Sequence, residues 1–276
     1  MAASRARRIA ACSWSLHPAN PGELVARLRA TGLSCVQLAL NPLREAPGTW
    51  GGAGEILRAA GFTVVSGMVG TRGEDYSSLE AIRRTGGVVP DGTWEDNWRD
   101  LRAAARLASG LGLRLVTFHA GFLPGDPASP GFEKLVERIR LVADAFAAAG
   151  VAIALETGQE TAATLADFLG RLDRPTVGVN FDPANMILYD KGDPVASLRE
   201  LAPWVRQVHI KDATRTRAAG TWGREVPVGS GDVDWPAFFA VLRTLPPEID
   251  LAIEREAGER RIEEIIQARR LIEAGA

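Results

Sequence analysis

The regular alternation of short apolar runs with longer amphipathic segments constrains the fold more than any other feature of this sequence. Each of eight apolar runs is followed by a segment of helical periodicity, and glycine, proline and aspartate occur in the turns between them. The runs lie at residues 8–16, 35–40, 63–70, 114–121, 151–158, 177–185, 205–213 and 249–258. This alternation is typical of βα units built around a parallel sheet.

The number of these units favours a closed barrel. Eight strand–helix pairs in 276 residues give about 34 residues per pair, which suits an α/β chain folded as a (β/α)8 TIM barrel. We therefore predict a single TIM-barrel domain over residues 1–276. An open doubly wound sheet has the same alternation, but no apolar run leads into the G-x-G-x-x-G turn of dinucleotide-binding folds, and the glycine-rich stretch at 48–54 follows a loop.

Composition excludes several classes of partner. The net charge of −2 gives no support for capture of nucleic acid or of an anionic membrane. No apolar stretch approaches the roughly 18 residues of a membrane span, and the basic N-terminus lacks the apolar core of a signal peptide. Cys12 and Cys35 both lie in apolar runs, which indicates buried thiols and not a disulfide framework. We expect a cytoplasmic protein, with a homo-oligomer left open.

Acidic residues end three of the apolar runs. VAIALE ends at Glu156, VGVNFD at Asp182 and DLAIE at Glu254, while the run at 205–213 carries His209 near its end. Because the carboxyl ends of barrel strands meet at one mouth, these four residues are predicted to hold one divalent metal ion. A helix cap or a loop salt bridge would explain any single acid, but four successive strand ends favour a common site.

The donor set predicts the kind of metal. Three carboxylates and one imidazole are mostly hard ligands, which favours Mn²⁺ or Mg²⁺ and also admits Co²⁺ or Zn²⁺. Burying three carboxylates together without a cation would be strongly unfavourable.

Three further residues are candidates for binding a substrate. His119 ends the fourth run, Asn185 follows Asp182 by three positions, and Lys211 shares the strand face of His209 by alternation. Each also has an ordinary structural explanation, such as helix capping by Asn185.

Two other features near the predicted mouth remain open. Trp14 could form an apolar wall for a substrate, although a core tryptophan is the more usual role. The loop after the seventh run contains Arg215, Arg217 and Arg224, which could bind a phosphate group. The interpretation that we prefer for this loop is a solvated lid with dispersed charge.

These motifs resemble those of the xylose isomerase-like barrels, which include sugar and sugar-phosphate isomerases and epimerases. The resemblance covers essentially the whole chain. It rests on ALET at Glu156, NFDPAN at Asp182, VHIKD at His209, the PVGSGDVDW segment at 227–235 and AIERE at Glu254. It implies a divalent metal held by the four residues predicted above, with the two glutamates flanking the substrate carbon as acid and base.

The activity expected from this resemblance is isomerisation or epimerisation of a ketose or ketose phosphate. Removing a proton α to a carbonyl requires stabilisation of the developing enediolate, which a metal supplies as a Lewis acid. Carboxylates on opposite faces of the carbon can act as base and acid. Return of the proton to the other face gives epimerisation, and return to the neighbouring carbon gives isomerisation. The sequence does not distinguish these outcomes.

Three other functions remain open. An inosose-dehydratase-like lyase acting on a cyclic polyol would share the first proton abstraction. An abasic-site endonuclease of this superfamily would use a trinuclear zinc site rich in histidine, whereas this chain has only His17, His119 and His209, and Asn185 stands where that pattern needs a histidine. A non-catalytic sugar-binding barrel would not need all four candidate ligands.

Overall fold

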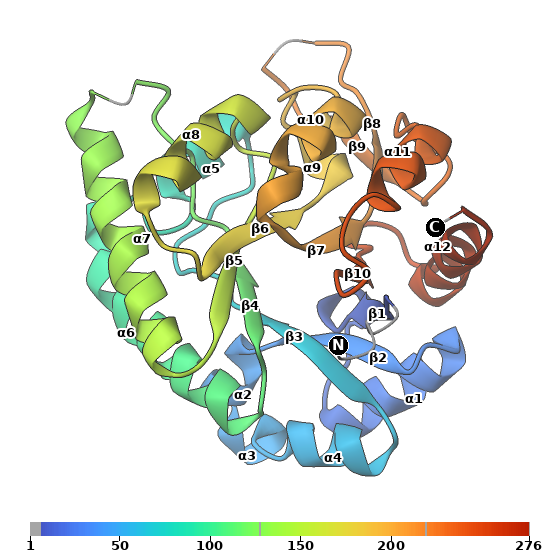
Figure 1. The fold of residues 1–276 in the computed structure, drawn as a ribbon. Coiled ribbons are helices and arrows are strands. Elements are labelled where there is room, and N and C mark those ends of the chain that lie inside the picture. The colour runs from blue at the N-terminus through green and yellow to red at the C-terminus, as the bar shows by residue number, and fades with distance from the viewer. Residues whose placement is uncertain (1–6, 127, 219, 276) are drawn as a thin grey trace, which may run out of the picture.

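Eight parallel strands form a closed barrel in the computed structural model, which describes residues 7–126, 128–218 and 220–275. The strands follow one another around the wall in the order β1-β10-β7-β6-β5-β4-β3-β2, with the helices outside them (Figure 1). Their bounds are β1 Ile9–Cys12, β2 Cys35–Ala39, β3 Thr63–Met68, β4 Leu115–Phe118, β5 Ala152–Glu156, β6 Val177–Phe181, β7 Val205–Ile210 and β10 Asp250–Ile253. The predicted (β/α)8 barrel is therefore confirmed.

The helices begin where the sequence places caps. The side chains of Asn20, Ser129, Thr161 and Asp193 each accept a hydrogen bond from an amide in the first turn of the helix that follows. The helix bounds are α1 Pro21–Thr31, α2 Asn41–Glu45, α3 Pro47–Trp50, α4 Ala53–Ala59, α5 Leu79–Thr85, α6 Asp91–Gly110, α7 Pro130–Ala148, α8 Ala162–Leu172, α9 Pro183–Leu188, α10 Pro194–Leu201, α11 Trp235–Leu242 and α12 Arg261–Gly275, with single 3₁₀ turns at Trp14–Leu16 and Ala202–Trp204.

The main core lies between the strands and the surrounding helices. Phe146 and Phe168 from the helices and Phe118 and Phe181 from the strands are fully buried there. Because helices cover the outer face of the sheet and side chains fill its interior, the strands read as nearly continuous apolar runs. Cys12 and Cys35 are both buried thiols, as predicted. Among the described residues, no helix is long and apolar enough to cross a membrane.

The loop after β7 contains an antiparallel hairpin that the sequence did not predict. Its strands are β8 Asp212–Thr214 and β9 Arg224–Val226, paired with Asp212 opposite Val226. The buried carboxylate of Asp212 organises the segment that follows. It accepts hydrogen bonds from the backbone N–H groups of Gly229, Gly231 and Val233 at 2.9, 3.1 and 3.3 Å, and from the indole of Trp235 at 2.9 Å. The 227–235 segment therefore folds around one internal anion.

Candidate metal and substrate site

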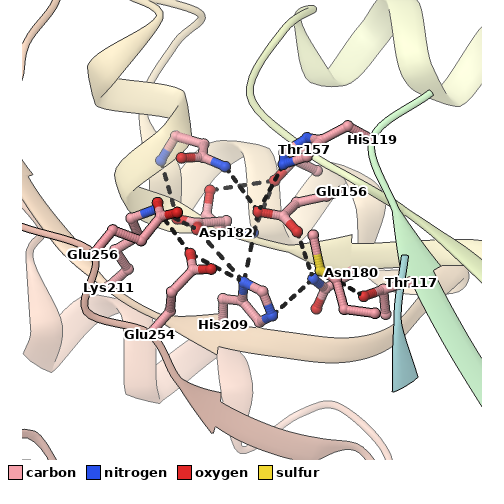
Figure 2. Close-up of polar contacts among 12 residues, drawn as sticks. Thr117, His119, Glu156, Thr157, Asn180, Asp182, His209, Lys211, Glu254 and Glu256 are labelled. Atoms are coloured by element: carbon pink, nitrogen blue, oxygen red, sulfur yellow. Dashed lines mark hydrogen bonds and ion pairs between the residues drawn. The ribbon is translucent and has the colours of Figure 1, made fainter. Parts of the chain in front are cut away.

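The four predicted metal ligands lie together at the carboxyl-terminal mouth of the barrel. Glu156 ends β5, Asp182 directly follows β6, His209 lies in β7, and Glu254 directly follows β10. One ligand atom from each residue lies within 4.8 Å of the others, and all four residues are buried (Figure 2). Since these four strands are neighbours around the barrel wall, their strand-end side chains converge on one point.

The imidazole of His209 lies among the three carboxylates. Its Nδ1 is 3.6 Å from Glu156 Oε1, 3.7 Å from Asp182 Oδ2 and 3.5 Å from Glu254 Oε2. Its Nε2 lies 2.8 Å from Gln37 Oε1. The amide nitrogen Nδ2 of Asn180 also lies 3.0 Å from Nε2. These two amides hold the Nε2 side of the ring, so that Nδ1 faces the three carboxylates, where it could bind a metal ion.

Two buried polar atoms at the centre of this cluster fit a metal ion. Asp182 Oδ2 and His209 Nδ1 have no hydrogen-bond partner among the residues that the structure describes. Leaving a buried polar atom unsatisfied costs about 1–3 kcal/mol, and one cation would satisfy both atoms. With three carboxylates and one nitrogen, the donor set suits a hard divalent ion such as Mn²⁺ or Mg²⁺.

Neighbouring charges set the ionisation of the acids. Burial raises the pKa of Glu254, but Lys211 and His209 outweigh this effect and hold that pKa well below its ordinary value. Burial also raises the pKa of Glu156, and the nearby histidines reverse the shift and lower it. For Asp182, burial dominates the opposing effect of Lys211 and raises the pKa. The two glutamates are therefore the acids most readily ionised.

The polar partners of Glu156 come from β6 and α9. Asn185 Nδ2 donates to Glu156 Oε1 at 3.0 Å, and Asn180 Nδ2 donates to Oε2 at 3.2 Å. The cap of α9 is Asp182, whose Oδ1 accepts from the backbone N–H of Asn185 at 3.0 Å. Helix capping, the alternative weighed for Asn185, is thus a role of Asp182. His119 Nε2 lies 3.6 Å from Glu156 Oε1.

The partners of Glu254 come from the 3₁₀ turn after β1 and from the residue that directly follows β7. Trp14 Nε1 donates to Oε1 at 2.7 Å, and Lys211 Nζ donates to Oε2 at 2.8 Å. Lys211 also donates to Glu256 Oε2 at 2.5 Å, so its ammonium lies between two carboxylates (Figure 2). These contacts leave Glu254 in a defined orientation within the cluster.

A cavity of about 580 Å³ opens over the cluster. The three predicted substrate residues, His119, Asn185 and Lys211, line it together with Glu156 and Glu254. Its remaining wall is largely apolar and aromatic, and includes Trp14, Met68, Tyr76, Leu188, Tyr189 and Trp222. Trp14 therefore lies at the mouth as a wall residue, one of the two roles considered for it.

The arginines after β7 do not reach this cavity. Arg215 lies on the outside, where it donates to the carbonyl of Gly192 at 3.3 Å and lies 3.7 Å from Asp190. Arg217 and Arg224 are exposed, and neither is among the described residues that line the cavity. This arrangement favours the preferred interpretation of dispersed, solvated charge over a phosphate site.

Several residues at the site were missed from the sequence. Gln37 and Asn180 are polar residues within apolar strands. Because buried polar side chains are nearly always hydrogen-bonded, such residues could have predicted a hydrogen-bond network inside the barrel. Glu256 follows Glu254 by two positions, so strand alternation could have placed it on the same side. Trp222 lies in an irregular loop, where no periodic pattern indicates its direction.

The fold and the site define a (β/α)8 barrel with a buried carboxylate–imidazole cluster that could hold a divalent metal. The sequence profile of the xylose isomerase-like TIM barrel family matches residues 15–274, and the chain belongs to this family.

Known proteins with related folds carry different activities. A xylose isomerase domain protein from Planctomyces limnophilus is similar over 99% of this chain and 97% of its own, with 28% identity and a TM-score of 0.84. An L-ribulose 3-epimerase shares the fold at 18% identity and a TM-score of 0.74, over 98% and 94% of the two chains. A 3-dehydroshikimate dehydratase from Bacillus anthracis is 31% identical over 128 residues, which span 40% of this chain and only 45% of that protein.

Glu160 is a buried acid on the mouth side of the barrel, but it is not one of the four candidate metal ligands. It lines a separate cavity of about 410 Å³ together with Lys191. Burial raises the pKa of Glu160 from 4.5 to about 8, and Lys191 opposes this shift only in part. The folded protein therefore keeps a proton that the unfolded chain releases as the pH rises above 4.5.

This difference predicts a loss of stability with rising pH. The stability that the protonated carboxyl group of Glu160 provides is fully present below pH 4.5 and is lost as the pH rises to 8. The free energy of unfolding at pH 7 should therefore be about 3 kcal/mol lower than below pH 4.5. Glu160→Gln should remove this part of the pH dependence. Urea unfolding between pH 4.5 and 8 tests it, with the exposed Glu200→Gln as control. Identical pH profiles for wild type and Glu160→Gln would contradict the prediction.

Proposed function

We propose that this protein is a divalent-metal-dependent isomerase or epimerase of a ketose or ketose phosphate. The observation that carries the proposal is that Glu156 and Glu254 belong both to the buried cluster and to the wall of the cavity. The two glutamates come from β5 and β10, at the two ends of the four-strand arc that supplies the cluster. A substrate carbon above the cluster would thus have a carboxylate on each side.

The protein's own residues provide the proton transfer in this proposal. Both glutamates have lowered pKa values and are ionised at neutral pH, so either can accept the proton α to the carbonyl. Asn185 orients Glu156, while Trp14 and Lys211 orient Glu254. In isomerisation, the glutamate that accepts the proton returns it to the neighbouring carbon. In epimerisation, the opposite glutamate first takes up a proton from solvent and delivers it to the other face of the same carbon.

A divalent cation held by Glu156, Asp182, His209 and Glu254 would supply Lewis-acid stabilisation of the negative charge that develops on the carbonyl oxygen. His119 lines the same cavity and would hydrogen-bond a substrate oxygen. The similarity to an L-ribulose 3-epimerase supports a ketose as the substrate.

Dehydration is the second candidate function. It begins with the same α-proton abstraction, but the protonated glutamate then gives its proton to the hydroxyl group on the next carbon, which leaves as water. The partial match to a 3-dehydroshikimate dehydratase favours keeping this alternative, together with a lyase acting on a cyclic polyol.

The test combines metal analysis with isotope exchange. Protein stripped with a chelator is reloaded with Mn²⁺, Mg²⁺, Co²⁺ or Zn²⁺, and its metal content is measured. Each form is then incubated in D₂O with a panel of ketoses and ketose phosphates, and NMR reports deuterium at the carbon α to the carbonyl. We expect metal-dependent exchange that yields an epimer or an aldose. Loss of water from the product would favour the dehydratase, and no bound metal together with no exchange would overturn the proposal.

A further inference from the structure

The charges around the cavity point to the chemical class of the substrate. We propose that the site takes an uncharged polyhydroxy carbonyl compound and discriminates against analogues that carry a phosphate or carboxylate group. This inference rests on the proposed function and narrows it, since the proposed function includes sugar phosphates.

Negative charge dominates the cavity. Glu74 and Glu256 line it in addition to Glu156 and Glu254, and Asp182 belongs to the cluster below. A divalent cation would offset the charge of Glu156, Asp182 and Glu254, whereas Glu74 and Glu256 line the cavity outside the four candidate ligands. An anionic group on the substrate would be repelled at this short range.

Lys211 is the only lysine or arginine among the described residues that line the cavity. Its ammonium is buried and already donates to Glu254 at 2.8 Å and to Glu256 at 2.5 Å. A phosphate usually requires an arginine fork, a free lysine or a group of free backbone amides. Lys211 keeps one N–H for a substrate oxygen, but its single charge is already shared between two carboxylates.

In the loops after the seventh and eighth barrel strands, which bind phosphate in many barrels, several backbone amides donate to the protein's own carboxylates. After β7, the amides of Gly229 and Gly231 donate to Asp212. After β10, the amides of Glu256 and Ala257 both donate to Glu225 at 3.0 Å. These four amides are therefore not free to bind a substrate phosphate.

The remaining contacts suit an uncharged sugar. Trp14, Tyr76, Tyr189 and Trp222 offer aromatic surface, on which the C–H face of a polyol can pack. Trp222 lies against Tyr189 with a ring-centroid distance of 4.8 Å. The buried Nε1 of Trp222 has no partner within the described part of the chain, and neither does Nδ1 of His119. Within this proposal, Trp222 is a specificity residue whose indole N–H donates to a substrate hydroxyl.

The experiment compares matched pairs of substrates on the metal-loaded, full-length protein. Values of kcat/KM for deuterium exchange are measured for hexuloses and pentuloses and for their terminal phosphates, with 3-dehydroshikimate as the carboxylate case. We expect each uncharged ketose to exceed its phosphate by about 100-fold or more, the discrimination reached when a buried site leaves a charged group without partners. Equal or faster exchange with the phosphates would overturn the inference and leave the proposed function standing.

A binding measurement separates failure of the inference from failure of the proposed function. Ribitol and ribitol 5-phosphate lack a carbonyl group, so their affinities, measured by calorimetry, do not depend on turnover. Tighter binding of ribitol supports the selectivity even if no ketose undergoes exchange. Tighter binding of ribitol 5-phosphate contradicts it.

Two variants test the residues that carry the argument. Glu256→Gln weakens the hold on Lys211 and removes one acid, so the preference for uncharged substrates should fall about 10-fold. Trp222→Phe keeps the aromatic wall but loses the donor, and should raise KM for the best ketose about 10-fold with a smaller change in kcat. Trp98→Phe, on the outer helix α6, is the matched control. An unchanged KM in Trp222→Phe would remove Trp222 from the site, and an unchanged preference in Glu256→Gln would contradict the electrostatic argument.

Discussion

Replacing Glu254 with glutamine is expected to lower the rate of α-proton exchange by about 10²–10⁴-fold, the range over which general acid–base catalysis acts. Glutamine has nearly the same shape but cannot accept the proton. It offers one acceptor oxygen where the carboxylate has two, so either Trp14 or Lys211 loses a partner. We therefore also expect a stability loss of about 1–3 kcal/mol, which thermal unfolding would measure.

A companion variant separates the loss of the acid from the loss of fold. Glu254→Asp keeps the negative charge, but its side chain is shorter by one methylene group. This variant should retain more metal than Glu254→Gln, while its rate of α-proton exchange should remain low. Glu259→Gln, an exposed glutamate five positions further along the chain, is the control and should behave as wild type. Undiminished exchange in Glu254→Gln would remove Glu254 from the acid/base role, and metal analysis of the same sample would show whether it still serves as a ligand.

The effect of Asp182→Asn on stability is expected to change sign with metal. Burial raises the pKa of Asp182, so its ionised form is unfavourable beside the two glutamates when no metal is bound. In the presence of a chelator, the variant should therefore be as stable as wild type or more stable. With a divalent cation at 100 times its dissociation constant, wild type should gain about 2.7 kcal/mol in the free energy of unfolding. The variant should lose most of this gain, because its amide is a poorer ligand.

The chain offers a matched control for this experiment. Asp193 caps α10 by accepting a hydrogen bond from the amide of Ala196 at 2.8 Å, as Asp182 caps α9. Asp193 is exposed, however, and is not one of the four candidate metal ligands. Asparagine is an equally good cap, so Asp193→Asn should leave the metal-induced gain unchanged. Denaturant unfolding with and without Mn²⁺ provides the measurement. Equal gains in wild type and Asp182→Asn would exclude Asp182 as a ligand.

Much of the fold could be predicted because its signals are local. Apolar runs, helical periodicity and capping residues such as Thr161 each depend on a few neighbouring positions, and Thr161 does cap α8, Ala162–Leu172. The β8–β9 hairpin was not predicted, because its short strands carry no clear alternation and depend on contacts around Asp212. Its existence is decided by pairing across a loop.

The candidate site shows the same division. Strand-end positions were enough to group Glu156, Asp182, His209 and Glu254, since parallel strands in a barrel must end at a common mouth. The hydrogen bond of Gln37 to His209 joins residues 172 positions apart, and no pattern in the sequence connects them. Asn185 was chosen as a polar residue near the mouth, but its donation to Glu156 appeared only once α9 was placed.

The sequence by itself determined the barrel and the four residues that meet at its mouth, because the order of apolar runs and the residue at the end of each run are properties of the linear chain. Only the tertiary structure decided what those residues face. Lys211 reads in the sequence as a free cation for a substrate, yet it lies between Glu254 and Glu256, more than 40 positions away. Since the energy of a buried charge depends on its nearest neighbours in space, the pairing of Lys211 with two carboxylates, from which we infer an uncharged substrate, became visible only in the fold.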